Sequence, residues 1–489
     1  MSAIKNIAKN TSLLIAANII GLFIGFIQNI YLAGYLEPQY FGIINSALNL
    51  ATIFTYVTDL GIGTYLVMHL SRTPEDLKHF MGGALTLKTA LITTAYAALV
   101  VTAYLLGFTG TKLLVVLIIG VYVMITVITQ LLQSLFQIYQ SMVHVAICQL
   151  LHPFILTAGL IYILWSGSGV IVFSLVYVLS STIILIYTTA IVVKKYKITA
   201  VTVDLKLWAK LIVAGIPFSL SAILYYMYYK IDIQLIDSII GDAAVGYYSA
   251  ALKFIEAMMS IPTLYTLVAF PLVSYYFHKN SPYLQLLAEK SIKYLAMIGI
   301  PACIGIYLLA DKFIYLCFQD KYVASIGVLQ ALSIGLVFIF VGSFANTVLL
   351  ATNRQRITVI CSAVGAVFNI VLNLAIIPVY GIIGSAYVMT MTQILLTAMT
   401  YYYYIRSGNK LPDLFSLAKI TFCALVMGVF VYFARDLNLL VTITGAIVIY
   451  LIMIVVSRSL SKDDITMLSG IFLKKKEDGE SGDTTVAIK

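Results

Sequence analysis

Six ionisable residues interrupt long apolar stretches of this 489-residue sequence: Asp59, Lys88, Asp232, Asp237, Lys253 and Glu256, with Lys230 nearby. A charged side chain in such a stretch is costly to bury and marks a functional site by default. A lysine can bind an anionic ligand there, whereas a carboxylate can exchange a proton or a sodium ion. These residues therefore point to ligand binding and ion exchange inside an apolar protein.

Lys253 and Glu256 are three residues apart and so share one face of a helix. Lys253 could hold an anionic ligand, while Glu256 could release that ligand or couple its movement to an ion. The alternative is a structural ion pair that neutralises itself. The sequence leaves both interpretations open.

Asp59, Lys88 and Arg354 each admit a functional and a structural interpretation. Asp59 has no cation three or four residues away and stands beside Gly61 and Gly63, so it could take up an ion or cap a loosened helix turn. Lys88 could bind an anion or extend to lipid headgroups. Arg354 lies in a short loop and could meet an incoming anion, although the charge asymmetry described below also accounts for its position.

Side-chain amides recur in the first two apolar stretches, at Asn18, Gln28, Asn29, Asn45 and Asn49. Polar groups at membrane depth need partners. These amides could face a polar ligand across a cavity or form hydrogen bonds between helices, and the sequence does not decide between the two.

Composition indicates which elements must carry these residues. Of the residues, 61% are apolar and 10% are charged, whereas soluble proteins have roughly 45–50% and about 25%. Apolar segments recur from Thr11 to Val456, enough for about fourteen crossings of a hydrocarbon core. The sequence predicts an all-α polytopic membrane protein without a separate catalytic domain. We place the spans at 11–32, 41–69, 81–106, 113–136, 145–165, 170–193, 208–229, 245–277, 294–310, 325–351, 357–377, 382–405, 414–434 and 438–457.

The positive charges indicate the orientation. With the N-terminus in the cytoplasm, 23 of the 30 Lys and Arg residues lie in inward segments and five in outward ones. Cytoplasmic loops carry this excess, so both termini are expected in the cytoplasm. The net charge of +10 then reflects topology and attraction to anionic lipid headgroups rather than nucleic acid binding. Lys230, Asp232 and Asp237 are expected in a solvated loop at the outward end of the seventh span.

The five cysteines predict neither a disulfide nor a metal site. They are Cys148, Cys303, Cys317, Cys361 and Cys423, and neither a Cys-x-x-Cys motif nor a His cluster accompanies them.

Parts of the sequence repeat at a nearly constant offset. Residues 36–42 are echoed 204 residues later at 240–246, and Gly167 meets Gly381 at an offset of 214. Parallel repeats of this kind build two bundles with a substrate path between them. The expected units are a first six-helix lobe at 1–200, a second at 201–406, two further helices at 407–460 and a disordered cytoplasmic tail at 461–489.

Four segments resemble a known family: Lys9-Asn10-Thr11, Leu36 to Gly42, Asp59 to Gly63, and the stretch from Asn369 to Ala386. They are similar to the polysaccharide transporter family, the oligosaccharide-lipid flippases of a superfamily that also holds multidrug and toxic compound extruders and lipid II flippases. The resemblance covers nearly the whole chain. It implies fourteen helices, with two six-helix lobes around a V-shaped cavity. It also implies alternating access that moves a polyprenyl-diphosphate-linked glycan from the cytoplasmic to the outer leaflet.

Under this resemblance each candidate residue acquires a role. Binding of diphosphate and sugar is assigned to Lys253, Lys88, Arg354, Asn18, Asn29, Asn45 and Asn49, and ion coupling to Asp59 and Glu256. A cationic cavity would lower the cost of moving a phosphorylated head group through hydrocarbon. We expect no enzymatic activity, cofactor or metal. The coupling ion would be H⁺ or Na⁺, since the sequence holds no Walker-type phosphate loop.

Alternative functions remain at this stage. A drug or organic-cation exporter of the same superfamily would favour an acidic cavity. A membrane glycan polymerase or ligase would need a large outward loop, but the longest ones, at 230–244 and 311–324, are short. A scaffold that transports nothing also stays open.

The tyrosines and the expected partners complete the prediction. Two tyrosine clusters fit an aromatic belt at the membrane surface better than a platform for sugar rings: Tyr225, Tyr226, Tyr228 and Tyr229, and Tyr401, Tyr402, Tyr403 and Tyr404. The partners would be a lipid-diphosphate-linked oligosaccharide, membrane lipids, and glycan polymerases or glycosyltransferases, all in the cell membrane.

Overall fold

The computed structural model describes residues 2–71, 76–196, 202–279, 281, 283–411 and 413–459. Within these ranges the chain folds into helices and contains no β-strand. Eleven helices are long and apolar enough to cross a membrane. A helix satisfies its own backbone polar groups, which hydrocarbon cannot do. The predicted all-α polytopic fold is confirmed.

The helices follow one another through short connections. The first half forms α1 (Ser2–Asp59), α2 (Ile62–Leu70), α3 (Leu77–Leu105), α4 (Gly110–Ile138), α5 (Met142–Ser166), α6 (Val170–Ile191) and a π-helical turn, Val192–Tyr196. The second half forms α7 (Leu205–Ile239), α8 (Asp242–His278), α9 (Tyr283–Leu308), α10 (Ala310–Phe318), a 3₁₀ turn at Asp320–Tyr322, α11 (Ser325–Ala351) and α12 (Gln355–Arg406). The last two helices are α13 (Leu414–Phe433) and α14 (Leu439–Val456).

Two helices are long enough to cross twice. Non-helical backbone at Glu37 interrupts α1, and non-helical backbone at Gly381 interrupts α12. Each helix therefore comprises two successive crossing segments. With these halves counted separately and α7 added to the eleven apolar helices, the described chain makes fourteen crossing segments, which match the predicted spans.

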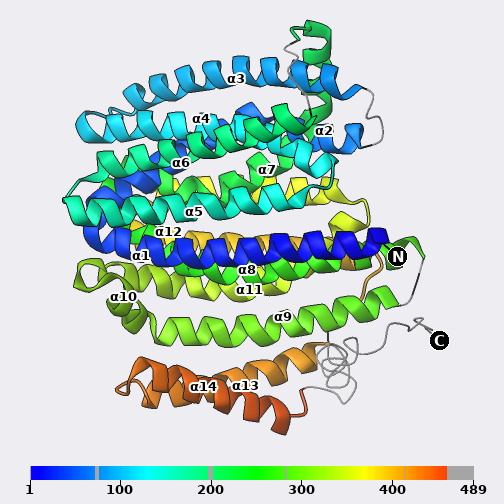
Figure 1. Ribbon diagram of the computed structural model, residues 1–489. Helices are drawn as coiled ribbons and strands as arrows, with labels where there is room; N and C mark the ends of the chain where they lie inside the picture. Colours follow the sequence, from blue (N-terminus) through cyan, green and yellow to red (C-terminus); the bar gives the residue numbers. More distant parts are fainter. Residues whose placement is uncertain are drawn as a thin grey trace, which may run out of the picture.

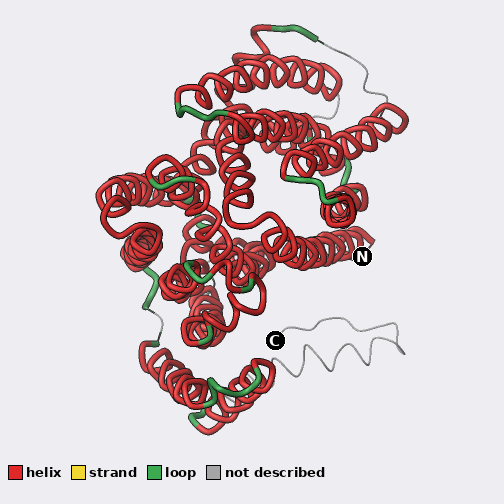
Figure 2. Tube along the Cα trace, turned by 90° about the vertical axis from the view of Figure 1, so that its left-hand side faces the viewer, coloured by secondary structure: helices red, strands yellow, loops and turns green. Residues whose placement is uncertain are grey.

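The helices pack as two lobes with an appended pair (Figure 1). In the first lobe, α4 packs against α6, and α1 packs against α4 and α5. In the second, α11 packs against α8, α9 and α12, and α12 packs against α7. The lobes meet mainly where α1 contacts α8 and α7. The pair α13 and α14 packs on α9 and forms a separate pair at the edge in Figure 2.

Backbone irregularities recur at equivalent positions of the two lobes. Glu37 has φ 64° and its counterpart 204 residues later, Gly241, has φ 115°. Gly167 and Gly381, separated by the predicted 214 residues, have φ values of 68° and 59°. Left-handed backbone is uncommon outside glycine, so its recurrence at matching junctions supports the predicted duplication of six helices.

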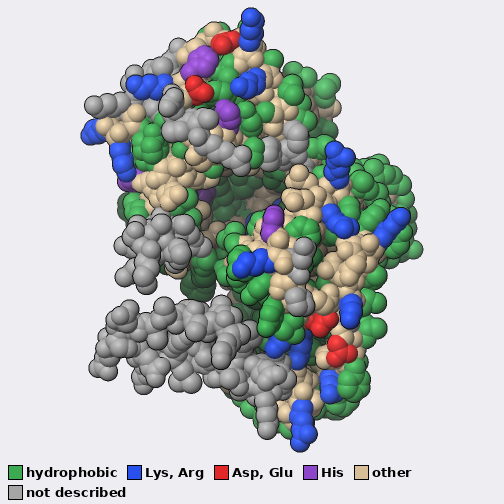
Figure 3. Space-filling view, turned by 90° about the vertical axis from the view of Figure 1, so that its right-hand side faces the viewer, with side chains coloured by type: hydrophobic (Ala, Val, Ile, Leu, Met, Phe, Trp, Pro, Cys, Tyr) green, Lys and Arg blue, Asp and Glu red, His purple; other side chains and the backbone are tan. Residues whose placement is uncertain are grey.

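The two ends of the bundle differ in character. The first and last described residues lie at the same end, which we call the terminal end, and the opposite end is the distal end (Figure 1). Lys and Arg side chains gather on the terminal end, and this face is hollowed between the lobes (Figure 3). The predicted tail at 461–489 and the predicted lobe boundary at residues 200 and 201 lie outside the described residues.

Two predicted boundaries are wrong by ten residues or more. The ninth span was expected to begin at residue 294, but α9 begins at Tyr283. The seventh span was expected to end at residue 229, but α7 continues to Ile239. Asp232 and Asp237 are therefore not in a solvated loop: their exposed fractions are only 1% and 5%. Burial of both carboxylates inside the protein requires polar partners, which the neighbouring helices supply.

Candidate functional site

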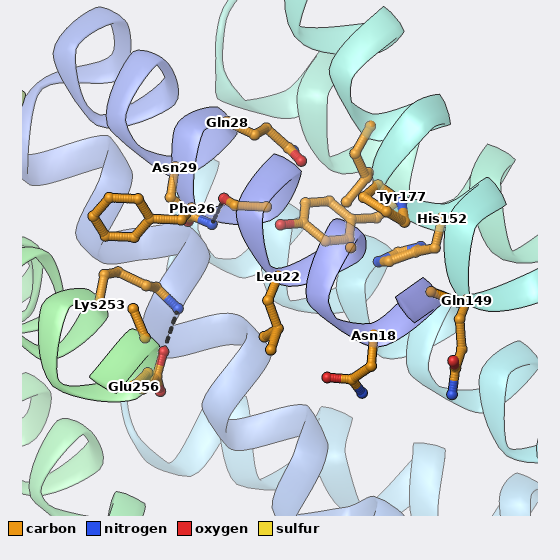
Figure 4. A pocket seen from close by; sticks show the side chains of 16 residues that line it. Asn18, Leu22, Phe26, Gln28, Asn29, Gln149, His152, Tyr177, Lys253 and Glu256 are labelled. Carbon is orange, nitrogen blue, oxygen red and sulfur yellow. Dashed lines mark hydrogen bonds and ion pairs between the residues drawn. The ribbon is translucent and has the colours of Figure 1, made fainter. Parts of the chain in front are cut away.

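A cavity of about 400 Å³, here called the central cavity, lies between the lobes. Helix α1 contributes Asn18, Gln28 and Asn29, and α5 contributes Gln149 and His152. Opposite them, α8 contributes Lys253 and Glu256, and both side chains point into the cavity (Figure 4). The lining is thus rich in amides, with its charge concentrated on α8.

Two lysines converge on one carboxylate at this cavity. Lys253 Nζ lies 3.1 Å from Glu256 Oε2, and Lys230 Nζ of α7 contacts the other oxygen, Oε1. The cluster carries one net positive charge and is only partly exposed, where water screens charge less than it does in bulk. An anion that enters the cavity would meet Lys253 and Glu256 in its lining, whereas Lys230 joins the cluster through Glu256 and is not itself a lining residue.

The structure changes the interpretation of the Lys253 and Glu256 pair. Each lysine alone would neutralise Glu256, but together they exceed it by one charge. The self-neutralising pair considered from sequence is therefore incomplete. The missing partner, Lys230, was expected near a solvated loop, and only the extra length of α7 brings it to Glu256.

A second, larger cavity adjoins the central one. It has a volume of about 900 Å³ and is lined almost wholly by apolar side chains of α1, α8, α9, α10, α13 and α14. We call it the apolar cavity. Leu22, Phe26 and Ala257 line both cavities, so the two are contiguous.

The four predicted amide residues divide into two groups. Asn18 and Asn29 line the central cavity, although Asn29 also donates to Gly25 O of its own helix at 2.7 Å. Asn45 is buried and donates to Phe41 O at 2.8 Å. Asn49 donates to Lys230 O at 3.1 Å and accepts from a tyrosine of α7, so it positions that helix. Interhelical hydrogen bonding, the alternative considered from sequence, describes Asn49.

Three of the four α7 tyrosines are wholly or partly buried, whereas Tyr225 is 44% exposed. Tyr226 donates to Asn49 Oδ1 at 2.5 Å, and Tyr229 donates to Met259 Sδ at 3.1 Å. Tyr225 and Tyr228 line a third cavity, described below. The aromatic belt expected for this cluster is wrong for Tyr226 and Tyr229, whose hydroxyls bond to α1 and α8.

Lys88 and Asp59 pair with each other in the first lobe. Lys88 Nζ lies 2.5 Å from Asp59 Oδ1, and the Lys88 side chain is fully buried. Neither residue is among those that line the central cavity. Extension of Lys88 to lipid headgroups is wrong for this conformation, and Asp59 has a cation that sequence spacing did not reveal.

Arg354 lies at the terminal end, in the exposed connection between α11 and α12. Its guanidinium contacts Ser407 Oγ, at the end of α12. This position is away from the central cavity, as the topological interpretation of the sequence allows.

A buried polar network surrounds Asp232 in the second lobe. Tyr248 donates to Asp232 Oδ2 at 2.8 Å, and Asn373 donates to Asp232 Oδ1 at 3.1 Å. Asn373 Oδ1 and Ser385 Oγ are buried without a hydrogen-bond partner among the described residues. Among the described residues Asp232 forms no direct salt bridge, and its carboxylate is held by these hydrogen bonds and by its electrostatic interaction with Lys230.

Asp232 and both asparagines of this network were named from the sequence, but their contacts with one another were not predicted. Asp232 was placed in a loop, and the asparagines at positions 369 and 373 served only as marks of family resemblance. Their spacing of four residues puts both amides on one helix face. That spacing, beside a buried aspartate, is the signal that could have revealed the cluster.

Comparison with known proteins places the chain among membrane proteins of glycan biosynthesis. The family model described as "Polysaccharide biosynthesis protein" matches residues 7–277, more than half of the chain. The model described as "Lipid II flippase MurJ" matches residues 231–455.

Individual relatives are distant in sequence. The capsular polysaccharide biosynthesis protein CapF of Staphylococcus aureus is 23% identical over 406 residues, which cover 81% of this chain and 99% of that protein. The probable low-salt glycan biosynthesis flippase Agl15 of Haloferax volcanii is 24% identical over 199 residues, which cover 40% of this chain and 42% of that protein.

Solved structures share the fold. The lipid II flippase MurJ in an inward closed conformation aligns with a TM-score of 0.76 at 15% identity, over 94% of this chain and 98% of that one. An inward-facing multidrug resistance transporter of the MATE family aligns with a TM-score of 0.66 at 13% identity, over 79% of this chain and 94% of that one. At such identities the likeness concerns the fold alone.

Proposed function

The chain belongs to the polysaccharide biosynthesis protein family, and from this premise we propose that it carries a polyprenyl-diphosphate-linked oligosaccharide across the membrane by alternating access. Such a cargo has an anionic head and a long apolar tail. The convergence of Lys230 and Lys253 on Glu256 is the observation that carries the proposal, because it leaves one net positive charge on a cluster that reaches the cavity through Lys253 and Glu256. A diphosphate can take the place of the carboxylate on either ammonium group.

The adjoining apolar cavity supports the same cargo. Its volume of about 900 Å³ and apolar lining suit a prenyl tail, and it meets the central cavity beside the charged cluster. A tail held there stays in a hydrocarbon-like medium while the head group crosses in a polar one. This division avoids the cost of moving an anion through lipid.

We propose that loading occurs from the cytoplasm and release at the outer leaflet. The excess of Lys and Arg at the terminal end, together with the hollow in that face, supports a cytoplasmic terminal end of a cell-membrane protein. Glycosyltransferases would then supply the cargo and a polymerase would use it. The protein itself would form no covalent bond.

Coupling to an ion gradient is assigned to Asp232 rather than to Asp59 or Glu256. The latter two already pair with lysines, whereas the described contacts of Asp232 are hydrogen bonds from neutral donors. Uptake of H⁺ or Na⁺ at Asp232 would neutralise this buried carboxylate. Export of an organic cation is less well supported, because the cluster of Lys230, Lys253 and Glu256 at the cavity wall carries two lysines and one carboxylate.

Binding by purified protein tests the proposal. We expect Lys253→Ala to bind a polyprenyl diphosphate about tenfold or more weakly than the unchanged protein, because a charge-assisted hydrogen bond is lost. Lys279→Ala, an exposed lysine at the end of the same helix, is the matched control and should bind normally. Unchanged binding by Lys253→Ala, or preferential binding of tetraphenylphosphonium, would contradict the proposal.

A further inference from the structure

A third cavity, of about 520 Å³, lies within the second lobe between α7, α8, α11 and α12. We call it the hydroxyl cavity, because ten of its 21 lining residues carry a hydroxyl or amide side chain besides Tyr225 and Tyr228. None of these lining residues is Lys, Arg, His, Asp or Glu. Its volume lies within the roughly 300–1,000 Å³ typical of small-molecule sites.

The hydroxyl cavity lies further along α8 than Lys253 and Glu256 and shares no lining residue with the central cavity. Thr263 and Thr266 line it, and they follow Glu256 at helical spacings that keep them near its side of the helix. Phe254 and Met258, which line the apolar cavity, lie on roughly the opposite side of α8. Glu256 thus lies on the same side of α8 as Thr263 and roughly opposite Phe254 and Met258.

The hydrogen bonds of the lining leave acceptors available to a ligand. Ser343 donates to Phe340 O at 2.8 Å, and Thr397 donates to Phe338 O at 3.0 Å. A hydroxyl that donates to backbone keeps its oxygen lone pairs as acceptors. Thr358 donates to Asn346 Oδ1 at 3.1 Å, and the amide of Asn346 supplies donors. The cavity therefore offers both the hydrogen-bond donors and the hydrogen-bond acceptors that sugar hydroxyls need.

We propose that the hydroxyl cavity is a binding site for the sugar residues next to the diphosphate, and that it favours neutral sugars over uronic acids. This inference rests on the proposed function, since it uses the cargo's order of tail, diphosphate and glycan. The three cavities follow the same order around α8. The lining of this cavity contains no cation, so the carboxylate of an anionic sugar would lose its water there without a positively charged partner to compensate.

A paired substitution tests this site with little risk to folding. Asn346→Leu with Thr358→Val removes both partners of one hydrogen bond, which is nearly neutral for stability when shape is kept. The control is Thr444→Val, whose exposed hydroxyl donates to Leu440 O of its own helix on α14. Circular dichroism and thermal unfolding of each variant verify that the fold is intact.

Three probes are compared by equilibrium binding: a polyprenyl diphosphate without sugar, the same carrier with a neutral N-acetylhexosamine disaccharide, and the same carrier with a hexuronic acid disaccharide. The unchanged protein should bind the neutral conjugate most tightly. The paired variant should bind it roughly fivefold more weakly for each hydrogen bond lost, and the bare carrier as before. Three results would overturn the inference. The paired variant could lose as much affinity for the bare carrier as for the neutral conjugate, or lose no affinity for the neutral conjugate. The unchanged protein could also bind the uronic conjugate more tightly than the neutral one.

The same measurement separates this inference from the proposed function. Lys253→Ala should weaken all three probes alike, because it removes a contact to the diphosphate. If Lys253→Ala changes none of them while the paired variant still loses the neutral conjugate, the diphosphate site is refuted and the sugar site stands. If only Lys253→Ala has an effect, the sugar site is refuted and the diphosphate site stands.

Discussion

Gly42 and Gly246, which occupy equivalent positions of the two lobes, pack against each other's helix at the distal end. A Cβ atom on Gly42 would collide with the carbonyl oxygen of Asp242, and one on Gly246 would collide with the carbonyl oxygen of Pro38. Pro38 and Asp242 are themselves 204 residues apart. The contact is therefore reciprocal, as expected where a pseudo-twofold axis passes between the lobes.

Alanine at position 246 should push the lobes apart at the distal end. We expect Gly246→Ala to lower the free energy of unfolding by about 1–3 kcal/mol, the usual cost of overpacking, and to raise hydrogen exchange in residues 239–247. The control is Gly34→Ala, since nothing lies within 4 Å of a Cβ at that position of α1. It should be neutral or stabilising by up to about 1 kcal/mol. Equal behaviour of the two variants would argue against close contact of the lobes.

Two lysines, Lys112 and Lys321, form ion pairs that join the lobes at the distal end, and the pairs of the two lysines should differ in strength. Lys112 Nζ lies 2.6 Å from Asp237 Oδ1 and 2.7 Å from Asp242 Oδ1, and the Asp237 side chain is fully buried. Lys112→Ala would leave that carboxylate without its cation, which costs about 3–5 kcal/mol. The hydrogen bond from Ser46 at 2.7 Å would remain.

The pair between Lys321 and Glu37 has an Nζ–Oε1 distance of 2.7 Å and side-chain exposures of 47% and 59%. Its loss in Lys321→Ala should cost about 0–1 kcal/mol, as for other exposed pairs. Thermal and denaturant unfolding in detergent would compare the two lysine variants. A larger loss for Lys321→Ala than for Lys112→Ala would contradict the described burial.

The pair formed by Asp59 and Lys88 predicts an asymmetry between its partners. Asp59→Asn leaves the fully buried Lys88 ammonium without its anion, whereas Lys88→Ala leaves a carboxylate whose side chain is 36% exposed. We expect Asp59→Asn to destabilise the protein by about 3 kcal/mol and Lys88→Ala by less, because water can reach Asp59. Transport by folded Lys88→Ala should keep its dependence on the ion gradient. Loss of that dependence would indicate that Asp59 and Lys88 take part in ion coupling.

Asp232→Asn should uncouple transport from the ion gradient. The variant removes the negative charge that a proton or sodium ion would neutralise, while Tyr248 keeps an acceptor. We expect proteoliposomes to lose the response of transport to an imposed proton or sodium gradient, with binding of the bare carrier unchanged. Asp311→Asn is the control, because Asp311 pairs with the exposed Arg435 on the periphery. A normal gradient response in Asp232→Asn would refute the assignment.

Much of the fold could be predicted from the sequence because local signals specify it. Apolar length locates crossing helices, and the echo of residues 36–42 at 240–246 indicates the duplication without knowledge of any contact. The end of α7 could not be found in this way. The apolar run is interrupted by three charged residues, Lys230, Asp232 and Asp237. Their partners lie on other helices and stabilise these charged side chains inside the protein.

The candidate site was predictable only where its members lie close in sequence. Lys253 and Glu256 share one helix and could be paired from their spacing. Lys230 reaches Glu256 from 26 residues away, and Asp59 meets Lys88 across 29. Such pairs depend on how helices cross, which spacing along the chain does not encode.

Helix α8 can act as a lever with its pivot at Gly246. A rise of about 1.5 Å per residue puts Lys253 about 10 Å and Thr266 about 30 Å from that pivot. Any tilt of α8 about this point moves the wall of the hydroxyl cavity about three times as far as the lysine. A phosphorylated head bound at Lys253 would therefore be displaced less by such a tilt than a glycan bound in the hydroxyl cavity.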